Sequence, residues 1–347
     1  MICLRNFEVS ILPGTAFMAT ASLSTQAICP VCGSACTQPP LYRFSVAEAA
    51  AHFCPVTRSA ERNKRLAKCI QRLWQADHCT VLGCEECGFA FGLPFVGGDE
   101  EFYSILHEHR DYPAWRWDYG IGLNLAVSKF PGGRILDIGA GTGAFLRTLG
   151  KHWDCYAVEK SSATQQELER LGIKVSPDVF TLSETESNRF EVVTLFQVLE
   201  HIAEFRPLLL SCRRLLRQGG HLVVTVPDAA AMIRQKRMTG HDDMPPNHIS
   251  KWTPASLRMV LTEAGFEVGP TVCEPSSWRN LKAAVHMRVM ADASGRRSLA
   301  AQVYHIQKKH LRRTALMFLG LPALVRLLPN ARQLRRGGAF ALIGVAR

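Results

Sequence analysis

The stretch Arg134-Ile-Leu-Asp-Ile-Gly-Ala-Gly-Thr-Gly-Ala-Phe-Leu146 decides the fold of this chain. A short apolar run leads into Gly139, Gly141 and Gly143, and the pattern predicts a helix from there through Leu149. Glycines let the backbone turn sharply and let a ligand come close to the main chain. The first N–H groups of a following helix have no partner within the helix. The stretch therefore predicts a buried strand, a ligand-binding loop and a helix.

A second predicted strand, Cys155 to Val158, ends at Glu159, which lies 20 residues after Gly139. An acid at that distance suits a hydrogen bond to ribose hydroxyls. Two details argue against a dinucleotide such as NAD. The glycine spacing is G-x-G-x-G, and Asp137 precedes the first glycine by two residues. A carboxylate there would oppose a pyrophosphate but can receive a cationic amino-acid group, which favours S-adenosylmethionine as the cofactor.

The rest of this region alternates strands and helices, as a doubly wound α/β fold requires. A helix is predicted over residues 205 to 217, which stop at Gly219-Gly220, and another begins with Pro254 at its first position. Further strands are predicted at 173–175, 190–196, 221–226, 266–268 and 339–346. We expect a Rossmann-like, mostly parallel sheet.

Five segments in this order resemble a class I methyltransferase. They are ILDIGAGTGAFL from Ile135, the acid Glu159, FEVVTLFQVLEH from Phe190, LLRQGGHLVVTVP from Leu215 and PPNHISKWTPASLRMVLTEAGFEV from Pro245. The closest resemblance is to small-molecule methyltransferases of the quinone-methyltransferase-like type, from about Gly132 to Val268 and again in the final strand. The resemblance implies cofactor contacts by a set of loop residues, namely Asp137, Gly139, Ala140, Gly141, Glu159, Gln197 and Val198.

Cysteine is concentrated at the N-terminal side, where nine of the twelve lie at or before Cys87. Cys29-Pro-Val-Cys32-Gly and Cys84-Glu-Glu-Cys87-Gly are paired C-x-x-C-G knuckles, and four such thiolates fill the tetrahedral shell of a structural Zn²⁺ ion. The 51 residues between the knuckles exceed the usual spacing. Residues 42 to 76 of this insert look helical and are expected to cap the substrate pocket. Reduced buried cysteines and disulfides remain the alternatives to zinc.

Two histidines are the candidate catalytic bases. His201 follows Glu200 just beyond a predicted strand, at the sheet edge where α/β folds bind ligands. His248 lies in the Pro245-Pro246-Asn247-His248 loop before the helix that begins at Pro254. A general base is needed only if the methyl acceptor loses a proton, and either histidine can instead order its loop. Glu200 with His201 is also a candidate pair of ligands for a divalent metal ion.

The net charge of +11 comes from one segment. Residues 278 to 347 hold 14 Lys and Arg and a single acid, Asp292, whereas the first 277 residues have a net charge of −2. Such a segment favours an anionic partner. Residues 311 to 336 combine apolar residues with arginine pairs, and the apolar part is expected to be too short to span a bilayer and contains Pro322 and Arg326. We expect peripheral membrane contact, an anionic methyl acceptor, or packing on the core.

The sequence thus predicts five regions: an extension at 1–27, a zinc ribbon with a helical insert at 28–110, a Rossmann-like core at 111–277, a basic helical appendage at 278–336 and a final core strand at 337–347. Aromatic residues Tyr112, Trp115, Trp117 and Tyr119 precede the core and are expected to pack on it or to line the pocket. We expect a cytoplasmic protein, with Met18 as a second candidate start.

The preferred function is O- or C-methylation of a sugar, glycan or secondary metabolite. An RNA methyltransferase is an alternative, but the Asn/Asp-Pro-Pro-aromatic pattern typical of amino-methylating nucleic-acid enzymes is replaced by Phe196-Gln-Val-Leu-Glu-His201, which argues against nucleic acid as a partner. A third hypothesis is a scaffold without catalysis. The sequence leaves the acceptor and the oligomeric state open.

Overall fold

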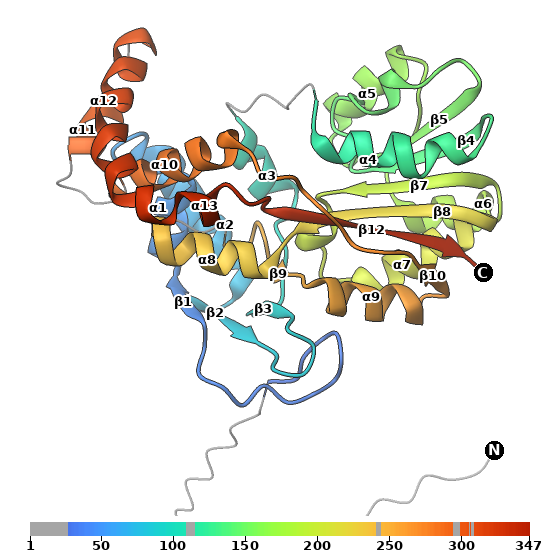
Figure 1. Ribbon diagram of the computed structural model, residues 1–347, viewed down its shortest axis with the longest axis horizontal. Helices are drawn as coiled ribbons and strands as arrows, with labels where there is room; N and C mark the ends of the chain where they lie inside the picture. Colours follow the sequence, from blue (N-terminus) through green and yellow to red (C-terminus); the bar gives the residue numbers. More distant parts are fainter. Residues whose placement is uncertain (1–26, 109–114, 241–243, 294–298, 305, 307–308) are drawn as a thin grey trace, which may run out of the picture.

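The computed structural model describes residues 27–108, 115–240, 244–293, 299–304, 306 and 309–347. Figure 1 shows two sheets, with a large α/β core at one side and the Cys-rich region and the C-terminal helices at the other. The extension at 1–26 and Tyr112 lie outside the described residues.

The central sheet has the strand order β10-β12-β8-β7-β4-β5-β6, and β11 also pairs with β12. Neighbours from β8 through β6 are parallel, whereas β12 runs antiparallel to β8, β10 and β11. The first five strands of the core follow the 3-2-1-4-5 order of the Rossmann fold. The bounds are β4 Gly133–Ile138, β5 Trp153–Val158, β6 Lys174–Ser176, β7 Phe190–Phe196, β8 Leu216–Pro227, β10 Phe266–Val268, β11 Val272–Cys273 and β12 Ala339–Ala346. The predicted Rossmann-like α/β core is confirmed.

Alternation along the strands gives the sheet two apolar faces. Ile135 and Val192 pack with α4 (Trp117–Leu125) and α5 (Ser162–Arg170), while Leu136 and Val193 pack on the other face with further helices. These are α6 Val179–Thr185, α7 Phe205–Leu215 and α9 Pro254–Glu263, and α8 (Ala229–Thr239) follows β8. Because both faces are covered, the central strands β4, β7 and β8 contain runs of buried Val, Ile and Leu.

The segment after the glycine loop differs from the prediction. Residues 141 to 149 form turns and a short 3₁₀ helix, Leu146–Thr148, in place of the expected α-helix. Gly141 and Gly143 both have positive φ, which right-handed helical residues lack. The residues that remain before Gly150 form further turns and the 3₁₀ helix.

The N-terminal region has its own antiparallel sheet, β1-β2-β3-β9. Its strands are β1 Tyr42–Ser45, β2 His78–Gly83, β3 Ala90–Leu93 and β9 Ser250–Lys251. The helical prediction for the insert is confirmed by α1 (Val46–Phe53) and α2 (Ala60–Trp74), which pack with α3 (Glu100–His107), whereas residues 42 to 45 form β1. Since β9 comes from the core, the two regions share a sheet.

The C-terminal appendage consists of α10 Trp278–Ala293, α11 Leu299–Tyr304, α12 Lys309–Leu327 and α13 Ala331–Leu334, with a 3₁₀ turn at Leu328–Asn330. The chain then returns to the core as β12, so the appendage is an excursion from the sheet (Figure 1).

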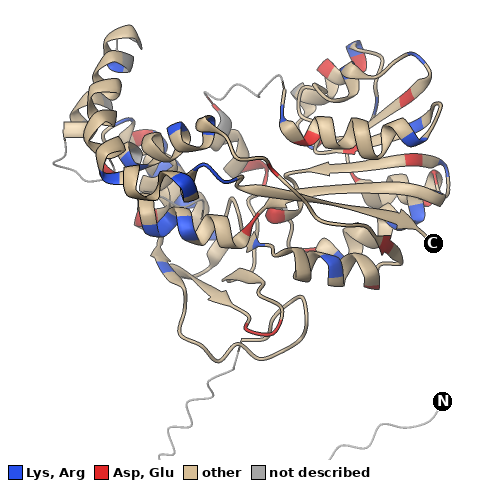
Figure 2. Cartoon of the chain, in the orientation of Figure 1, with Lys and Arg blue, Asp and Glu red and all other residues tan. Residues whose placement is uncertain are grey.

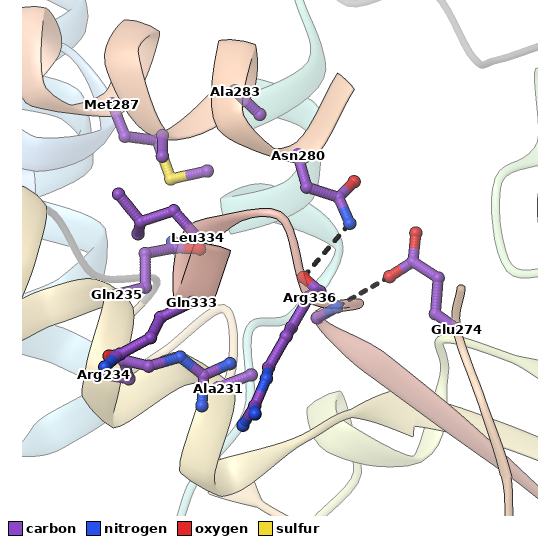
Figure 3. A pocket seen from close by; sticks show the side chains of 12 residues that line it. Ala231, Arg234, Gln235, Glu274, Asn280, Ala283, Met287, Gln333, Leu334 and Arg336 are labelled. Carbon is purple, nitrogen blue, oxygen red and sulfur yellow. Dashed lines mark hydrogen bonds between the residues drawn. The ribbon is translucent and has the colours of Figure 1, made fainter. Parts of the chain in front are cut away.

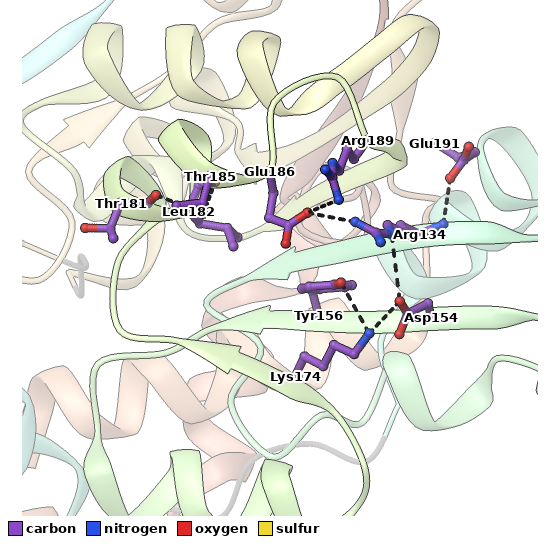
Figure 4. Close-up of polar contacts among 10 residues, drawn as sticks. All are labelled: Arg134, Asp154, Tyr156, Lys174, Thr181, Leu182, Thr185, Glu186, Arg189 and Glu191. Carbon is purple, nitrogen blue, oxygen red and sulfur yellow. Dashed lines mark hydrogen bonds and ion pairs between the residues drawn. The ribbon is translucent and has the colours of Figure 1, made fainter.

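The amino ends of the parallel strands carry a network of ion pairs (Figure 4). Arg134 pairs with Glu186 at 2.7 Å, and Lys174 pairs with Asp154 at 2.7 Å. These half-exposed pairs stabilise the fold only modestly. They lie opposite the carboxyl ends, where the predicted site residues are found.

Candidate active site

The predicted cofactor residues come together at the carboxyl edge of the sheet. Gly139, Ala140 and Gly141 follow β4, Glu159 follows β5, and Gln197 and Val198 follow β7. Neighbouring parallel strands end side by side, so three loops that are distant in sequence meet. A Cβ atom added at Gly139, whose φ is +75°, would lie 2.7 Å from Val198 Cγ2, so only glycine lets the first loop approach the loop after β7 this closely.

Asp137 lies just below this edge and is fully buried. The Thr194 hydroxyl donates a hydrogen bond to its Oδ1 atom at 2.7 Å. Burial raises the pKa of Asp137 to about 7, and the Thr194 hydrogen bond only partly opposes the shift. A carboxyl group with such a pKa is readily ionised by a cationic ligand at neutral pH.

Glu159 holds the glycine loop in place. Its Oε2 atom accepts a hydrogen bond from the Gly141 N–H at 3.1 Å, and its Oε1 atom accepts from the Lys160 N–H at 2.9 Å. The carboxylate therefore lies against the loop, as a group that binds ribose hydroxyls would.

Gln197 has a φ of +57°, which is uncommon for a residue other than glycine. Its N–H donates to Thr225 O at 2.9 Å, and this bond holds the unusual conformation at the end of β7. Such backbone strain is concentrated at functional sites. The turn directs the chain from β7 into the 3₁₀ helix Leu199–His201.

The two candidate histidines meet over a buried carboxylate. Their ring centroids lie 4.6 Å apart, and the Glu200 Oε1 atom is 3.9 Å from His201 Nε2 and 3.7 Å from His248 Nε2. Glu200 is fully buried. His201 Nδ1 lies 2.8 Å from the carbonyl oxygen of Asn247, which can only accept, so Nδ1 carries a proton and donates it. In neutral His201 the lone pair that can accept a proton is therefore on Nε2, the atom that faces Glu200.

Ligand atoms of Glu200, His201 and His248 all lie within 4.8 Å of one another. The same is true of Cys29, Cys32, Cys84 and Cys87. The Sγ atoms are 3.7 Å apart between Cys29 and Cys87 and 3.4 Å apart between Cys32 and Cys84. A tetrahedron with Zn–S bonds of about 2.3 Å has S–S edges of roughly 3.8 Å, so the four sulfur atoms fit a zinc ion.

The two knuckles have the same local structure. Gly33 N donates to Cys29 O, and Gly88 N donates to Cys84 O, each at 3.0 Å. Both glycines have positive φ, at +75° and +71°, which explains the glycine that follows each C-x-x-C pair. The sequence pattern thus specified the geometry of both halves of this site.

Residues 115–270 match a family described as a methyltransferase domain. This region is a methyltransferase domain. It includes every strand of the parallel sheet, the glycine loop and both histidines.

Two relatives are named ubiquinone biosynthesis O-methyltransferase. The one from Chelativorans sp. is 25% identical over 136 residues, which cover 37% of this chain and 52% of the relative. The one from Alkalilimnicola ehrlichii is 26% identical over 100 residues, which cover 26% and 40%. The matches thus span about half of these relatives or less. A solved S-adenosylmethionine-dependent methyltransferase from Archaeoglobus fulgidus aligns with a TM-score of 0.43 at 15% identity, over 70% of this chain and 99% of that one.

The cysteine-rich region is joined to the loop of the methyltransferase domain that carries His248. Strand β9 follows His248 by two residues and pairs with β3. Gly92 N donates to Ile249 O at 2.9 Å, and Gly98 N donates to Pro246 O at 2.8 Å. On the other side of the loop, Ile249 N donates to Glu200 O at 3.0 Å. The His248 loop is therefore held between the N-terminal sheet and the loop that carries His201.

The second knuckle also touches this part of the methyltransferase domain. Thr253 caps α9, and its hydroxyl donates to Cys87 O at 3.0 Å. Phe89 packs on Trp252 with the ring centroids 4.6 Å apart, within one hydrophobic cluster that also contains Cys84 and Cys87. Any ion held by the four cysteines would thus stabilise the segment that positions His248.

Sequence reasoning missed Asp118 and Arg116. Asp118 is fully buried on α4, forms an ion pair with Arg116 at 2.5 Å and accepts a hydrogen bond from Thr225 at 3.1 Å. The positive charge of Arg116 lowers the pKa of Asp137, and the negative charge of Asp118 raises it. The sequence signal that could have identified Asp118 was an acidic residue among aromatic residues. Its place there is explained by its burial and its ion pair with Arg116. Of that aromatic cluster, Tyr119 packs on Phe145 and Phe196, whereas Trp115 is exposed.

Proposed function

We propose that this protein transfers a methyl group from S-adenosylmethionine to an oxygen atom of a small molecule. The single observation that carries the proposal is the meeting, at one edge of the sheet, of the glycine loop with its two carboxylates and of the His201–His248–Glu200 cluster. The names of the relatives support O-methylation over C-methylation. Our preferred acceptor is a hydroxyl group of a sugar, glycan or secondary metabolite.

In this proposal the residues near the glycine loop hold the cofactor. Asp137 balances the charge of the amino-acid end, Glu159 binds the ribose hydroxyls, and the backbone of Gly139, Ala140 and Gly141 lies against the ligand. Gln197 and Val198 lie beside it after β7. S-adenosylmethionine supplies a methyl group on a sulfonium centre, so the contribution of the protein is mainly to position the acceptor and exclude water.

The histidine cluster would remove the acceptor proton. Because His201 Nδ1 donates to Asn247, the Nε2 atom is the one that can take up a proton. The imidazolium that results would be stabilised by Glu200, whose Oε1 atom lies 3.9 Å away. His248 faces the same oxygen at 3.7 Å and is the second candidate for this role. A divalent ion bound by these three residues would instead orient the acceptor oxygen.

We also propose that Cys29, Cys32, Cys84 and Cys87 hold a structural zinc ion. All four thiols serve as ligands, which leaves no open position for catalysis. The ion would hold the N-terminal sheet against the His248 loop through the Cys87–Thr253 contact.

Calorimetric titration with S-adenosylmethionine, with NAD alongside, tests the proposal. The Glu159→Ala variant should weaken binding at least tenfold, whereas Glu169→Ala, which removes an exposed acid on α5, serves as the matched control. Methyl-transfer assays with sugars, phenols and RNA as acceptors should then show activity with the sugars. Preference for NAD, or no binding of either ligand, would overturn the proposal and favour a scaffold function.

A further inference from the structure

The outer face of α12 is apolar and exposed. Leu311, Phe318, Leu321, Val325 and Leu328 follow one another along this side, at spacings of three, four or seven residues, and each is 49% to 66% exposed. Met317 beside them is 69% exposed. Monomeric soluble proteins seldom expose a contiguous apolar surface of this kind unless it binds something. We call these six residues the α12 face.

The inner side of α12 packs on α10. Ala323 and Leu327 are buried there against Leu281, Val289 and their neighbours. Beside this contact lies a groove of about 950 Å³ that is lined mainly by apolar residues of the two helices. The helices thus form a layer with one face packed on the protein and one exposed apolar face, of which Met317, Leu321 and Leu328 also line this groove.

The appendage is fixed to the core at its base. Asn280 donates hydrogen bonds to the carbonyl oxygens of Arg335 and Arg336. Gly338 N donates to Glu274 at 2.8 Å, and Figure 3 shows this contact and the one between Asn280 and Arg336. These contacts surround a cavity of about 190 Å³ between α8, α10 and α13. The orientation of the α12 face is therefore set by the core.

Positive charge is concentrated at the base of this layer. Figure 2 shows Lys and Arg residues gathered at the base of the appendage, over α8, α10 and α13. On α8 they are Arg234 and Arg237, on α10 they are Arg279, Lys282 and Arg288, and on α13 the residue is Arg332. Lys236 of α8 instead lies over the rings of Tyr42 and Phe44, and Arg288 also pairs with Asp292. Arg326 is exposed on α12 itself. No acid follows Asp292 in the sequence. An apolar stripe with basic residues around it suits the surface of an anionic bilayer.

We propose that the appendage docks the protein on an anionic phospholipid membrane, with the α12 face in the interface and the basic residues against the headgroups. This inference concerns the appendage and does not depend on the identity of the acceptor. It would place the active site beside a bilayer, which favours an amphiphilic acceptor.

A peripheral position fits better than a spanning one. An 18-residue window within the run His310–Leu334 has a mean hydropathy of 1.4, so by length and composition alone this run could span a membrane, which corrects the prediction that its apolar part is too short. However, α12 ends at Leu327 and a 3₁₀ turn with Pro329 follows. Its 19 residues measure about 28 Å at about 1.5 Å per residue, and one side is occupied by α10. Spanning would require that contact to be broken.

A second copy of this chain suits the α12 face less well. The first five residues of α12 include Lys309, Arg312 and Arg313, and Arg326, Arg332, Arg335 and Arg336 lie at or beyond its other end. Pairing two such helices would bring basic ends together whether they ran parallel or antiparallel. Anionic headgroups of a bilayer attract the same basic residues.

Co-sedimentation of the full chain with vesicles tests the proposal. We expect binding to phosphatidylglycerol–phosphatidylcholine vesicles, at least about tenfold weaker binding to pure phosphatidylcholine, and release by high salt. Replacing Phe318, Leu321 and Val325 together by Ser should lower the affinity for anionic vesicles at least about tenfold. The matched control replaces Phe180, Leu210 and Met259 by Ser, which are exposed apolar residues on α6, α7 and α9.

Binding of S-adenosylmethionine and circular dichroism verify that the variants are folded, and they separate failure of this inference from failure of the proposed function. Equal binding by the α12 variant and the wild type would overturn the proposal. So would resistance to carbonate extraction, which indicates a spanning helix, or a dimer in light scattering that only the α12 substitutions abolish.

Discussion

Replacing Asp137 by Asn should stabilise the protein while it weakens cofactor binding. The folded pKa of Asp137, about 7, lies above its ordinary value of 3.8 because the carboxyl is buried. A raised pKa means that the unfolded chain releases this proton first, so the folded state loses stability as the pH rises from 3.8 to 7. At about 1.4 kcal/mol per pH unit, the loss is about 4 kcal/mol above pH 7.

The variant removes this cost because an amide does not ionise. The amide side chain introduced by Asp137→Asn would keep an oxygen to accept from Thr194, so the fold should be preserved. We expect the gain in unfolding free energy over the wild type to grow by roughly 3 kcal/mol between pH 5 and pH 8. Urea denaturation followed by tryptophan fluorescence, without ligand, measures it. S-adenosylmethionine affinity should fall at least tenfold, since the carboxylate charge is lost.

The control is Asp154→Asn, which removes a carboxylate from the half-exposed network at the opposite edge of the sheet. It should show neither the pH-dependent gain nor a change in affinity. If the unfolding free energies of Asp137→Asn and the wild type differ by the same amount at pH 5 and at pH 8, then Asp137 is ionised in the folded protein at both. In that case the argument that burial raises its pKa is wrong.

Three further predictions concern the histidine cluster, the ribbon and Thr194. Glu200→Gln should lower kcat at least about tenfold and leave S-adenosylmethionine affinity unchanged, because the carboxylate would stabilise a protonated imidazole; a full kcat would exclude this role. Cys84→Ser and Cys87→Ser together should abolish zinc in metal analysis and reduce kcat more than cofactor affinity, since the His248 loop loses its contact with the second knuckle; unchanged kinetics in a zinc-free protein would contradict the coupling. Thr194→Val should raise the pKa of Asp137 further by removing a hydrogen bond to the carboxylate, and the pH at which cofactor affinity increases should move upward with it; an unmoved profile would show that the bond has no such effect.

The sheet was predictable because its rules are local. The strands Phe190–Phe196, Phe266–Val268 and Ala339–Ala346 have the bounds that their apolar runs predict. The glycine loop and the two C-x-x-C-G knuckles are equally local, because each is a turn that needs glycine at a fixed position. The α-helix predicted through Leu149 was wrong. These residues form turns and a short 3₁₀ helix, which the spacing of their apolar residues does not distinguish from an α-helix.

Contacts between distant segments could not be read from the sequence. Asp118 is an ordinary acid until α4 brings it to Thr225 on β8, and burial then makes its pairing with Arg116 necessary. In the same way, His201 and His248 were separate candidates on loops far apart in the sequence. Their common carboxylate, Glu200, appears only when the loop after β7 meets the loop before β9.

The place of β9 links the N-terminal region to the active site. Two residues of the methyltransferase domain, Ser250 and Lys251, complete a sheet whose other strands come from the cysteine-rich region. Both are buried, so this pairing is part of the core and is not a surface contact. Since the strand begins two residues after His248, any change that loosens the N-terminal sheet must move the backbone of a proposed catalytic loop. We therefore expect the cysteine cluster to affect the proposed acid–base step through the backbone of the His248 loop.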